Sequence, residues 1–436
     1  MRAPFTLCSA TVLAVALLLA ELPAATADFR RDSAVSLPVV DADAAGRWVP
    51  GTPEQKETPK FWGGKFIDRM KQKFGHAACR AHRTSATIKY FIDRLANGGM
   101  PTGTPAEVRR DYLRLVPNEE EAAKVLLPHP HVNTSLPKRE LAEILATKTL
   151  IHRYLFYSAI SYCDNRTIAA EQSTVVLQQD DYPVPTPVNG FKILYWHEQD
   201  WLRYYIAASP YQKTIVLVFR GSMNNDNFKK SIDTKPIIPN AGLYASGWDT
   251  AQLPKEARLL RGYAGMAEKQ MEKAGADLLR AHRDFPDYAV VIAGHSMGGA
   301  VAHLAATHIR TYYGTRLPIS TVYTYNEPIP GNAVFNDWSA EVLHDVPFFR
   351  VTSKDVVTSL FQADLPGMKE KHRYRHAADI TEVHCPDAQK NEMIICDGGL
   401  DPKCVAGYSC NDLTWEFHSD FAGQRGSRRV CLLSQA

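Results

Sequence analysis

The segment that most constrains this chain is YAVVIAGHSMGGAVAHLAA, residues 288–306. Its first part, 289–293, is a short continuous apolar run, which is typical of a strand covered on both faces. The run passes directly into GHSMG (294–298), and a helical pattern follows from residue 300. A Gly-x-Ser-x-Gly turn between a buried strand and a helix is the context in which a serine acts as a nucleophile. We therefore predict that Ser296 is a catalytic nucleophile.

The rest of the C-terminal two thirds alternates between strand-like and helix-like patterns. We expect strands at 191–195, 201–207, 214–219, 288–293, 321–325 and 347–352, and helices at 140–162, 254–282 and 300–312. Strands that alternate with helices favour a mostly parallel sheet. Together with the serine turn, this predicts an α/β-hydrolase fold: a central, mostly parallel sheet flanked by helices, preceded by an N-terminal extension.

The first residues have the three parts of a secretory signal peptide. Arg2 is followed by an apolar run over 11–20 and by small residues at 25–27. A charged start, a short apolar core and a small-residue cleavage motif mark a segment that is removed on export. About ten apolar residues are too few to span a bilayer. We expect 1–27 to be a signal peptide and the protein to be secreted and extracellular; a short membrane anchor is the alternative.

Residues 28–139 differ in character from the rest of the chain. They begin with a stretch rich in Pro, Asp and Ala, and 61–75 follow the pattern of a basic amphipathic helix. Such a helix either makes peripheral contact with a membrane or packs on a neighbouring domain. Lys138-Arg139 follows a Pro-containing loop, and exposed polar segments are usual sites of proteolysis. We expect 28–139 to be an N-terminal extension removed as a propeptide, leaving a hydrolase domain over 140–436.

The cysteines agree with export to an oxidising compartment. Seven lie outside the signal peptide, and removal of Cys79 with the extension leaves six, an even number. An even set is typical of a disulfide framework in a secreted protein. Two Asn-x-Ser/Thr triplets, at Asn133 and Asn165, are candidate glycosylation sites.

A serine nucleophile needs a base, and the base needs an orienting carboxylate. In this fold the chain order is serine, acid, histidine. Asp355 closely follows the expected strand 347–352, so we predict that it is the acid. The residues alone leave four candidates for the base: His372, His376, His384 and His418.

Four motifs resemble, in the same order, those of the fungal lipase-like (class 3) family. They are FRGS (219–222), GHSMGGA (294–300), the GN of EPIPGN (331–332) and VTSKDVV (351–357). The resemblance covers roughly 145–436 and implies the fold already predicted from the patterns. It departs from the family at Glu327 and Pro330, which replace the more usual residues of the APRVGN loop.

The resemblance also implies roles for further residues. The family places its catalytic histidine near the C-terminus, before an aromatic pair and shortly ahead of the last cysteine, and His418 matches that position. It also implies that the backbone N–H groups of Met297 and Ser222 hold the oxyanion, because two donors must point to where that charge forms.

The segment after Ser222 corresponds to the lid helix of lipases. Met223, Phe228 and Ile232 could share one face of that lid. A lid hides apolar residues until an oily interface replaces it. The residues between these three are mostly Asn, Asp and Lys, so the segment is more polar than the family's lids.

The family's bridge between the start and the end of the domain implies a Cys163–Cys431 disulfide. Cys385, Cys396, Cys404 and Cys410 remain, and four cysteines allow three pairings. Proximity in the sequence favours Cys385–Cys396 and Cys404–Cys410. The chain has no Cys-x2-Cys spacing of a zinc site, no phosphate loop and no cofactor fingerprint, so we expect neither metal nor cofactor.

These observations lead to a specific expectation about function. The resemblance implies a secreted serine carboxylic-ester hydrolase that cleaves acylglycerols, a triacylglycerol lipase whose substrate lies at an oil–water interface. The alternatives are a soluble-ester hydrolase such as a feruloyl esterase, favoured by the polar lid, and a phospholipid-directed lipase that docks through helix 61–75. A formal net charge of +3 is too small to indicate a nucleic-acid partner.

Overall fold

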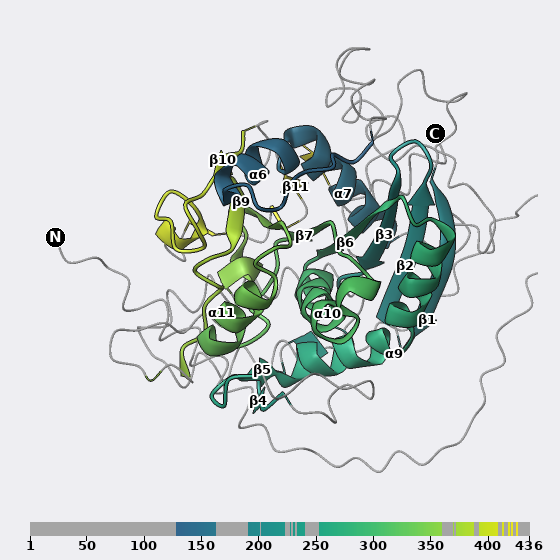
Figure 1. Cartoon of the computed structure of the whole chain (residues 1–436). Coiled ribbons are helices and arrows are strands. Elements are labelled where there is room, and N and C mark those ends of the chain that lie inside the picture. Colours follow the sequence, from purple (N-terminus) through teal and green to yellow (C-terminus); the bar gives the residue numbers. More distant parts are fainter. Residues whose placement is uncertain are drawn as a thin grey trace, which may run out of the picture. The chain divides into compact units, whose positions relative to one another are not determined.

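The computed structural model describes most of the C-terminal two thirds of the chain (Figure 1). The described residues are 128–162, 191–200, 202–222, 227, 230–231, 233–239, 253–359, 369, 372–387, 392–408, 412–413, 417–418, 420–421 and 424–425. All of them belong to the larger of two units of the chain, residues 1–20 and 86–436.

One eight-stranded sheet organises these residues, in the order β1-β2-β3-β6-β7-β8-β9-β10. The neighbours from β3 to β9 are parallel, whereas β1, β2 and β10 pair antiparallel at the two edges. The strands are β1 (Lys192–Gln199), β2 (Leu202–Ser209), β3 (Thr214–Phe219), β6 (Ala289–His295), β7 (Thr321–Tyr325), β8 (Phe348–Ser353), β9 (Thr381–Cys385) and β10 (Ile394–Ile395). The predicted central, mostly parallel sheet is confirmed; β9 and β10 were not predicted.

Helices cover both faces of this sheet (Figure 1). The five α-helices among the described residues are α6 (Lys138–Leu145), α7 (Lys148–Ile160), α9 (Arg261–Asp284), α10 (Met297–Tyr312) and α11 (Ala333–Val342). Short 3-10 turns are η2 (Gly314–Arg316), η3 (Val356–Ser359) and η5 (Val405–Gly407). Two small hairpins pair β4 (Pro236–Ile237) with β5 (Leu259–Leu260), and β11 (Asp420–Phe421) with β12 (Gln424–Arg425).

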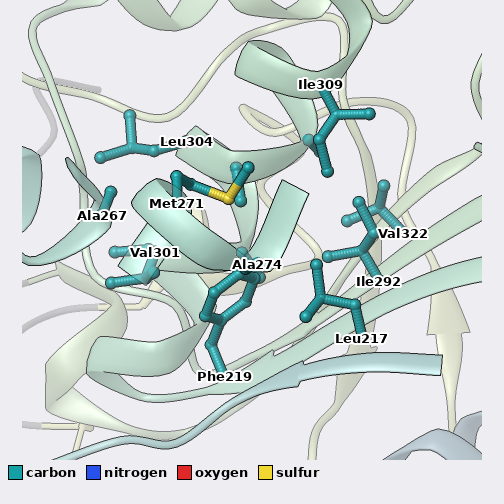
Figure 2. Packing of buried hydrophobic residues seen from close by; sticks show 14 of the residues in the cluster. Leu217, Phe219, Ala267, Met271, Ala274, Ile292, Val301, Leu304, Ile309 and Val322 are labelled. Carbon is teal, nitrogen blue, oxygen red and sulfur yellow. The ribbon is translucent and has the colours of Figure 1, made fainter. Parts of the chain in front are cut away.

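The strand alternation divides the core into two apolar layers. Along β3, Val216 and Val218 pack with α6 and α7, while Ile215 and Leu217 pack with α9, α10 and α11. Successive side chains of a strand point to opposite faces, so a continuous apolar strand fills both layers at once. Figure 2 shows the second layer, in which Leu217 and other strand residues meet Met271 of α9 and Leu304 of α10. This packing fixes α10, and with it the turn that precedes it.

The folded domain begins before residue 140. His129 is buried, its Nε2 lies 3.1 Å from Thr321 Oγ1, and its Nδ1 lies 2.8 Å from the hydroxyl of Tyr154. Its backbone N–H also donates to the carbonyl of Gln212 at 2.7 Å. Residues 128–139, which the expected cleavage at Lys138-Arg139 assigned to the extension, therefore make contacts with the hydrolase domain through His129.

The disulfide pairing preferred from sequence proximity is wrong. Cys396 is bonded to Cys404, not to Cys385. The register of β9 and β10 explains why, because Cys396 lies opposite Glu382 and its N–H donates to the Glu382 carbonyl at 2.9 Å. Three residues along a strand place the Cys385 and Cys396 Cα atoms on the order of 10 Å apart, beyond the span of a disulfide. Cys163, Cys410 and Cys431 lie outside the described residues.

Of the two candidate glycosylation sites, only Asn133 lies among the described residues. Asn133 is exposed, and its side-chain oxygen accepts from the backbone N–H of Ser135 at 3.0 Å; Asn165 lies outside the described residues. Among the residues that the structure describes, no helix has both the length and the apolar character needed to cross a membrane.

Candidate active site

Ser296 occupies a strained turn between β6 and α10. Its backbone has φ 58° and ψ −131°, a region that residues with a side chain rarely adopt and that recurs at functional sites. The two motif glycines make this turn possible. A Cβ at Gly294 would overlap the carbonyl oxygen of Gly298, and a Cβ at Gly298 would overlap the carbonyl oxygen of Phe219 in β3. The strand and the helix therefore approach each other closely and project the serine at the end of the sheet.

The N-terminus of α10 lies next to this serine. Met297 is the first residue of the helix, and the N–H groups of a first helical turn have no acceptor within the helix. They also carry the positive end of the helix dipole. Negative charge that develops beside Ser296 would therefore be stabilised.

The end of β3 approaches the serine from the other side. A Cβ at Gly221 would lie 2.7 Å from the carbonyl oxygen of His295 and 3.1 Å from the Cβ of Ser296. The next residue, Ser222, has its hydroxyl 3.5 Å from the Met297 sulfur and 3.1 Å from the Ser231 hydroxyl. Ser222 therefore lies against Met297, the residue that follows Ser296.

The structure brings Asp355 and His418 together. The Nδ1 atom of His418 lies 2.6 Å from Oδ2 of Asp355, which is fully buried just after β8. The other carboxylate oxygen of Asp355 accepts the N–H of Val357 at 3.2 Å. The His418 ring also lies beside the residue before the nucleophile, with its centroid 4.7 Å from that of His295.

The other histidines that the sequence offered have different partners. His376 is buried with its Nε2 3.0 Å from the carbonyl of Thr358, and burial holds its pKa well below the usual range. The Nδ1 atom of His384 lies 3.0 Å from the Thr352 hydroxyl, and its Nε2 atom lies 3.2 Å from the Tyr408 hydroxyl. Burial lowers the pKa of His384 to about 4. His372 is exposed. Contact with Asp355 thus favours His418 among the four.

His295 is a site residue that sequence reasoning missed, although it stands inside the GHSMG motif. Its Nε2 lies 2.7 Å from the carbonyl oxygen of His418, and its Nδ1 lies 2.8 Å from the Tyr162 hydroxyl. Burial lowers its pKa to about 3, with the charge of nearby His418 acting in the same direction. His295 is therefore neutral near pH 7 and donates from Nε2.

A second histidine–carboxylate pair lies deeper in the molecule. His303 of α10 has its Nδ1 2.7 Å from Oε1 of Glu327 and its Nε2 2.8 Å from the Ser339 hydroxyl of α11. The other oxygen of Glu327 accepts the Thr324 hydroxyl at 2.6 Å. The sequence indicated Glu327 only as a departure from the family pattern, and the structure pairs this buried carboxylate with His303 and Thr324.

The remaining predictions for the site concern the lid and a bound metal. The predicted lid residues Met223, Phe228 and Ile232 lie outside the described residues. Within the described ranges, three potential metal ligands gather at Glu382, Cys396 and Cys404. The two sulfurs are bonded to each other and the carboxylate pairs with Arg350, so these residues do not form a thiolate site.

Parts of this chain are similar to known lipases. Residues 216–365 match the model of the family described as Lipase (class 3). A secreted mono- and diacylglycerol lipase 2 from Gibberella zeae is 26% identical over 220 residues, 47% of this chain and 52% of that protein. Secreted mono- and diacylglycerol lipase A from Penicillium camembertii is 31% identical over 133 residues, 30% of this chain and 37% of that protein. The chain thus spans about half or less of the length of these curated relatives.

Among solved structures, a triacylglycerol lipase from Penicillium expansum superposes with a TM-score of 0.50 at 18% sequence identity. The match covers 66% of this chain and 97% of that one. The chain therefore has the α/β-hydrolase fold.

Proposed function

We propose, from the premise that this chain belongs to the class 3 lipase family, that it is a serine hydrolase of carboxylic esters whose substrates are acylglycerols. The relatives named above are mono- and diacylglycerol lipases. The observation that carries the proposal is the contact of His418 with buried Asp355 beside the strained turn of Ser296.

This arrangement supports acyl transfer in two steps. The Ser296 Oγ attacks the ester carbonyl carbon while His418 Nε2 takes the hydroxyl proton. Asp355 accepts the Nδ1–H of the histidine, which fixes the tautomer and stabilises the imidazolium that forms. The tetrahedral intermediate then expels the alcohol, which receives the proton from His418. A water molecule attacks the acyl-enzyme in the same way and releases the fatty acid and free Ser296.

We assign the oxyanion hole to the backbone N–H groups of Met297 and Ser222. Met297 supplies an N–H that has no acceptor within the helix at the start of α10, and Ser222 follows Gly221, where an added Cβ would lie 3.1 Å from the Ser296 Cβ. Removing one oxyanion donor costs about 10²- to 10³-fold in kcat in well-studied hydrolases. The Ser222 hydroxyl, held near Ser231, orients this residue.

We further propose that the protein is secreted, because the relatives named above are secreted lipases and Asn133 is exposed as a glycosylation acceptor would be. Removal of the extension as a propeptide would have to spare residues 128–137, which pack into the domain through His129. A Cys163–Cys431 bridge remains a proposal from the resemblance.

One feature favours a second candidate, hydrolysis of a soluble ester such as a feruloyl ester. The segment 223–233 is rich in Asn, Asp and Lys, whereas a lid opened by an oil surface needs an apolar face. The same chemistry at Ser296 would serve both substrates, so only the physical state of the substrate separates them.

The deciding experiment compares the secreted protein with its Ser296→Ala variant. Hydrolysis of a short-chain soluble ester and of an emulsified triacylglycerol is followed across the solubility limit of each. We expect the wild type to act on the acylglycerol with a rise in rate once an interface forms, and the variant to be inactive on both. Activity on the soluble ester alone favours the second candidate, and an active Ser296→Ala overturns the proposal.

A further inference from the structure

The main chain at His418 is bound by side chains from three strands of the central sheet. The His418 carbonyl oxygen accepts from His295 Nε2 at 2.7 Å and from Asn326 Nδ2 at 3.0 Å. The preceding carbonyl, of Phe417, accepts from the Ser353 hydroxyl at 2.9 Å. A carbonyl oxygen has two lone pairs, so the two donors fill the capacity of the His418 carbonyl.

Asn326 and Ser353 are themselves bound to each other. The Ser353 N–H donates to Oδ1 of Asn326 at 2.9 Å, and Nδ2 of Asn326 donates to the Ser353 hydroxyl at 2.9 Å. Both N–H groups of the Asn326 amide then have acceptors, because Nδ2 donates to Ser353 and to His418 and also lies 3.4 Å from the Phe417 carbonyl oxygen. The hydroxyl of Ser353 accepts from Asn326 and donates to Phe417. Each side chain is thus held by several hydrogen bonds, which restricts its movement.

The backbone turn at Asn326 directs its side chain toward the segment that carries His418. It follows β7 directly with φ 45°, in the left-handed region that Asn tolerates better than most residues. Its N–H donates to the carbonyl of Val351 in β8 at 2.9 Å, so the turn is tied to the neighbouring strand. The side chain is thereby aimed at the segment that carries His418.

The third donor, His295, is fixed in one tautomer. Because Nε2 donates to the His418 carbonyl, Nδ1 is the acceptor, and the hydroxyl of Tyr162 donates to it at 2.8 Å. His295 ends β6 immediately before Ser296. The His418 main chain is therefore tied to the same strand that carries the nucleophile.

We propose that Asn326, Ser353 and His295 are positioning residues that fix the main chain of the catalytic histidine. This inference rests on the proposed function, in which His418 moves the protons. Asp355 binds Nδ1 of the ring, whereas these three side chains bind the main chain that carries the ring. Together the four residues fix both the ring and the backbone of the catalytic histidine. Proton transfer needs this precision, because small displacements of a reacting group are costly.

The test is the Asn326→Gly variant, which keeps the backbone conformation and removes the side chain. We expect kcat to fall about 10- to 100-fold with KM within about threefold of wild type, because the amide positions the base and does not touch the ester. The matched control is Asn336→Ala. Asn336 is equally buried and donates to two carbonyls, those of Gly331 and Arg375, at 3.0 and 2.7 Å.

The control separates positioning from general stability. Both variants should lower the thermal midpoint of unfolding, but only Asn326→Gly should lower kcat. Wild-type kcat in Asn326→Gly, or an equal fall in both variants, overturns the proposal. If Asn326→Gly does not fold, Ser353→Ala is judged by the same criterion, since it deletes the hydroxyl bond to Phe417 and keeps the Ser353 N–H.

Failure of this inference is distinguishable from failure of the proposed function. Ser296→Ala is assayed on the same ester in the same series. If Ser296→Ala is inactive while Asn326→Gly and Ser353→Ala retain wild-type kcat, only the positioning role is overturned. If Ser296→Ala retains activity, the catalytic assignment itself is wrong.

Discussion

Two buried histidine–carboxylate pairs in this domain each lie near a serine. In the first, His418 joins buried Asp355 at 2.6 Å, and its ring lies against that of His295, the residue before Ser296. In the second, between α10 and α11, His303 joins buried Glu327 at 2.7 Å and a serine hydroxyl at 2.8 Å. We call them the outer and the inner relay, and we assign catalysis to the outer relay only.

The difference lies in the surroundings of each serine. In the inner relay, Ser339 lies within the regular helix α11, is completely buried, and shares its hydroxyl with Thr307 at 2.6 Å. Ser296 instead lies in a strained turn at the start of a helix, between the chain segments of Ser222 and Met297. A triad is recognised by geometry and roles, which include oxyanion donors and access for the substrate. The inner relay has the order of contacts but neither of these surroundings, so it acts as a buried polar network that joins two helices.

The largest contrast is expected between the two serines. Ser296→Ala should lower kcat by about 10⁴- to 10⁶-fold, because the nucleophile is lost. Ser339→Ala should leave kcat within about twofold and should lower the free energy of unfolding by about 1–3 kcal/mol, because the His303 ring loses a buried partner. Ester hydrolysis and chemical denaturation measure the two effects. A large loss of kcat in Ser339→Ala would show that the inner relay also takes part in catalysis.

The two carboxylates should differ in the same way, by a smaller factor. Asp355→Asn should lower kcat by about 10⁴-fold, since an amide no longer holds the histidine in the required tautomer. Glu327→Gln should keep kcat and lower the free energy of unfolding by about 1–3 kcal/mol, because the polar contacts of His303 and Thr324 are weakened. Kinetics and thermal unfolding of both variants give the result. Equal kinetic effects would contradict the assignment of roles.

The nucleophile is easier to propose from the sequence than its partners, for a physical reason. The GHSMG turn is local, and its strand and helix lie on either side of it in the sequence. Asp355 lies close to this end of the sheet because it follows β8, which the order β6-β7-β8 places near β6. His418 reaches the same region on a much later segment, which Asn326 and Ser353 bind. Patterns identified Asp355 from its place after a strand, but the choice of His418 among four histidines needed the family resemblance.

Other features depended on register and packing that no pattern displays. The Cys396–Cys404 bond follows from the pairing of β9 with β10, two strands that the sequence analysis did not predict. His129 binds the domain from an irregular segment, and the Lys138-Arg139 pair from which the boundary was predicted gave no sign of these contacts. Asn326 did leave a signal, since a polar residue directly after a parallel strand lies at the same end of the sheet as Ser296.

Low pH should lower the free energy of unfolding through buried histidines that lie outside the outer and inner relays. Burial lowers the pKa of His129 to about 3, assisted by Arg153 and His131, and lowers that of His308 to about 4. Both are neutral in the folded protein, whereas an unfolded histidine titrates at a pKa of about 6.5. Between these values the unfolded chain binds more protons, so the free energy of unfolding falls as the pH drops below about 6.5. The stabilisation is fully present above that pH.

Each such histidine contributes a slope of up to about 1.4 kcal/mol per pH unit. We expect His129→Gln to flatten the dependence of the unfolding free energy on pH between 4 and 6.5 by about one proton. Glu327→Gln should instead lower the free energy of unfolding across this pH range, because it weakens the contacts of the inner relay. Denaturation at a series of pH values measures both effects. If the unfolding free energy of His129→Gln depends on pH as steeply as that of the wild type, this histidine is not the source of the acid sensitivity. Other buried groups would then cause it.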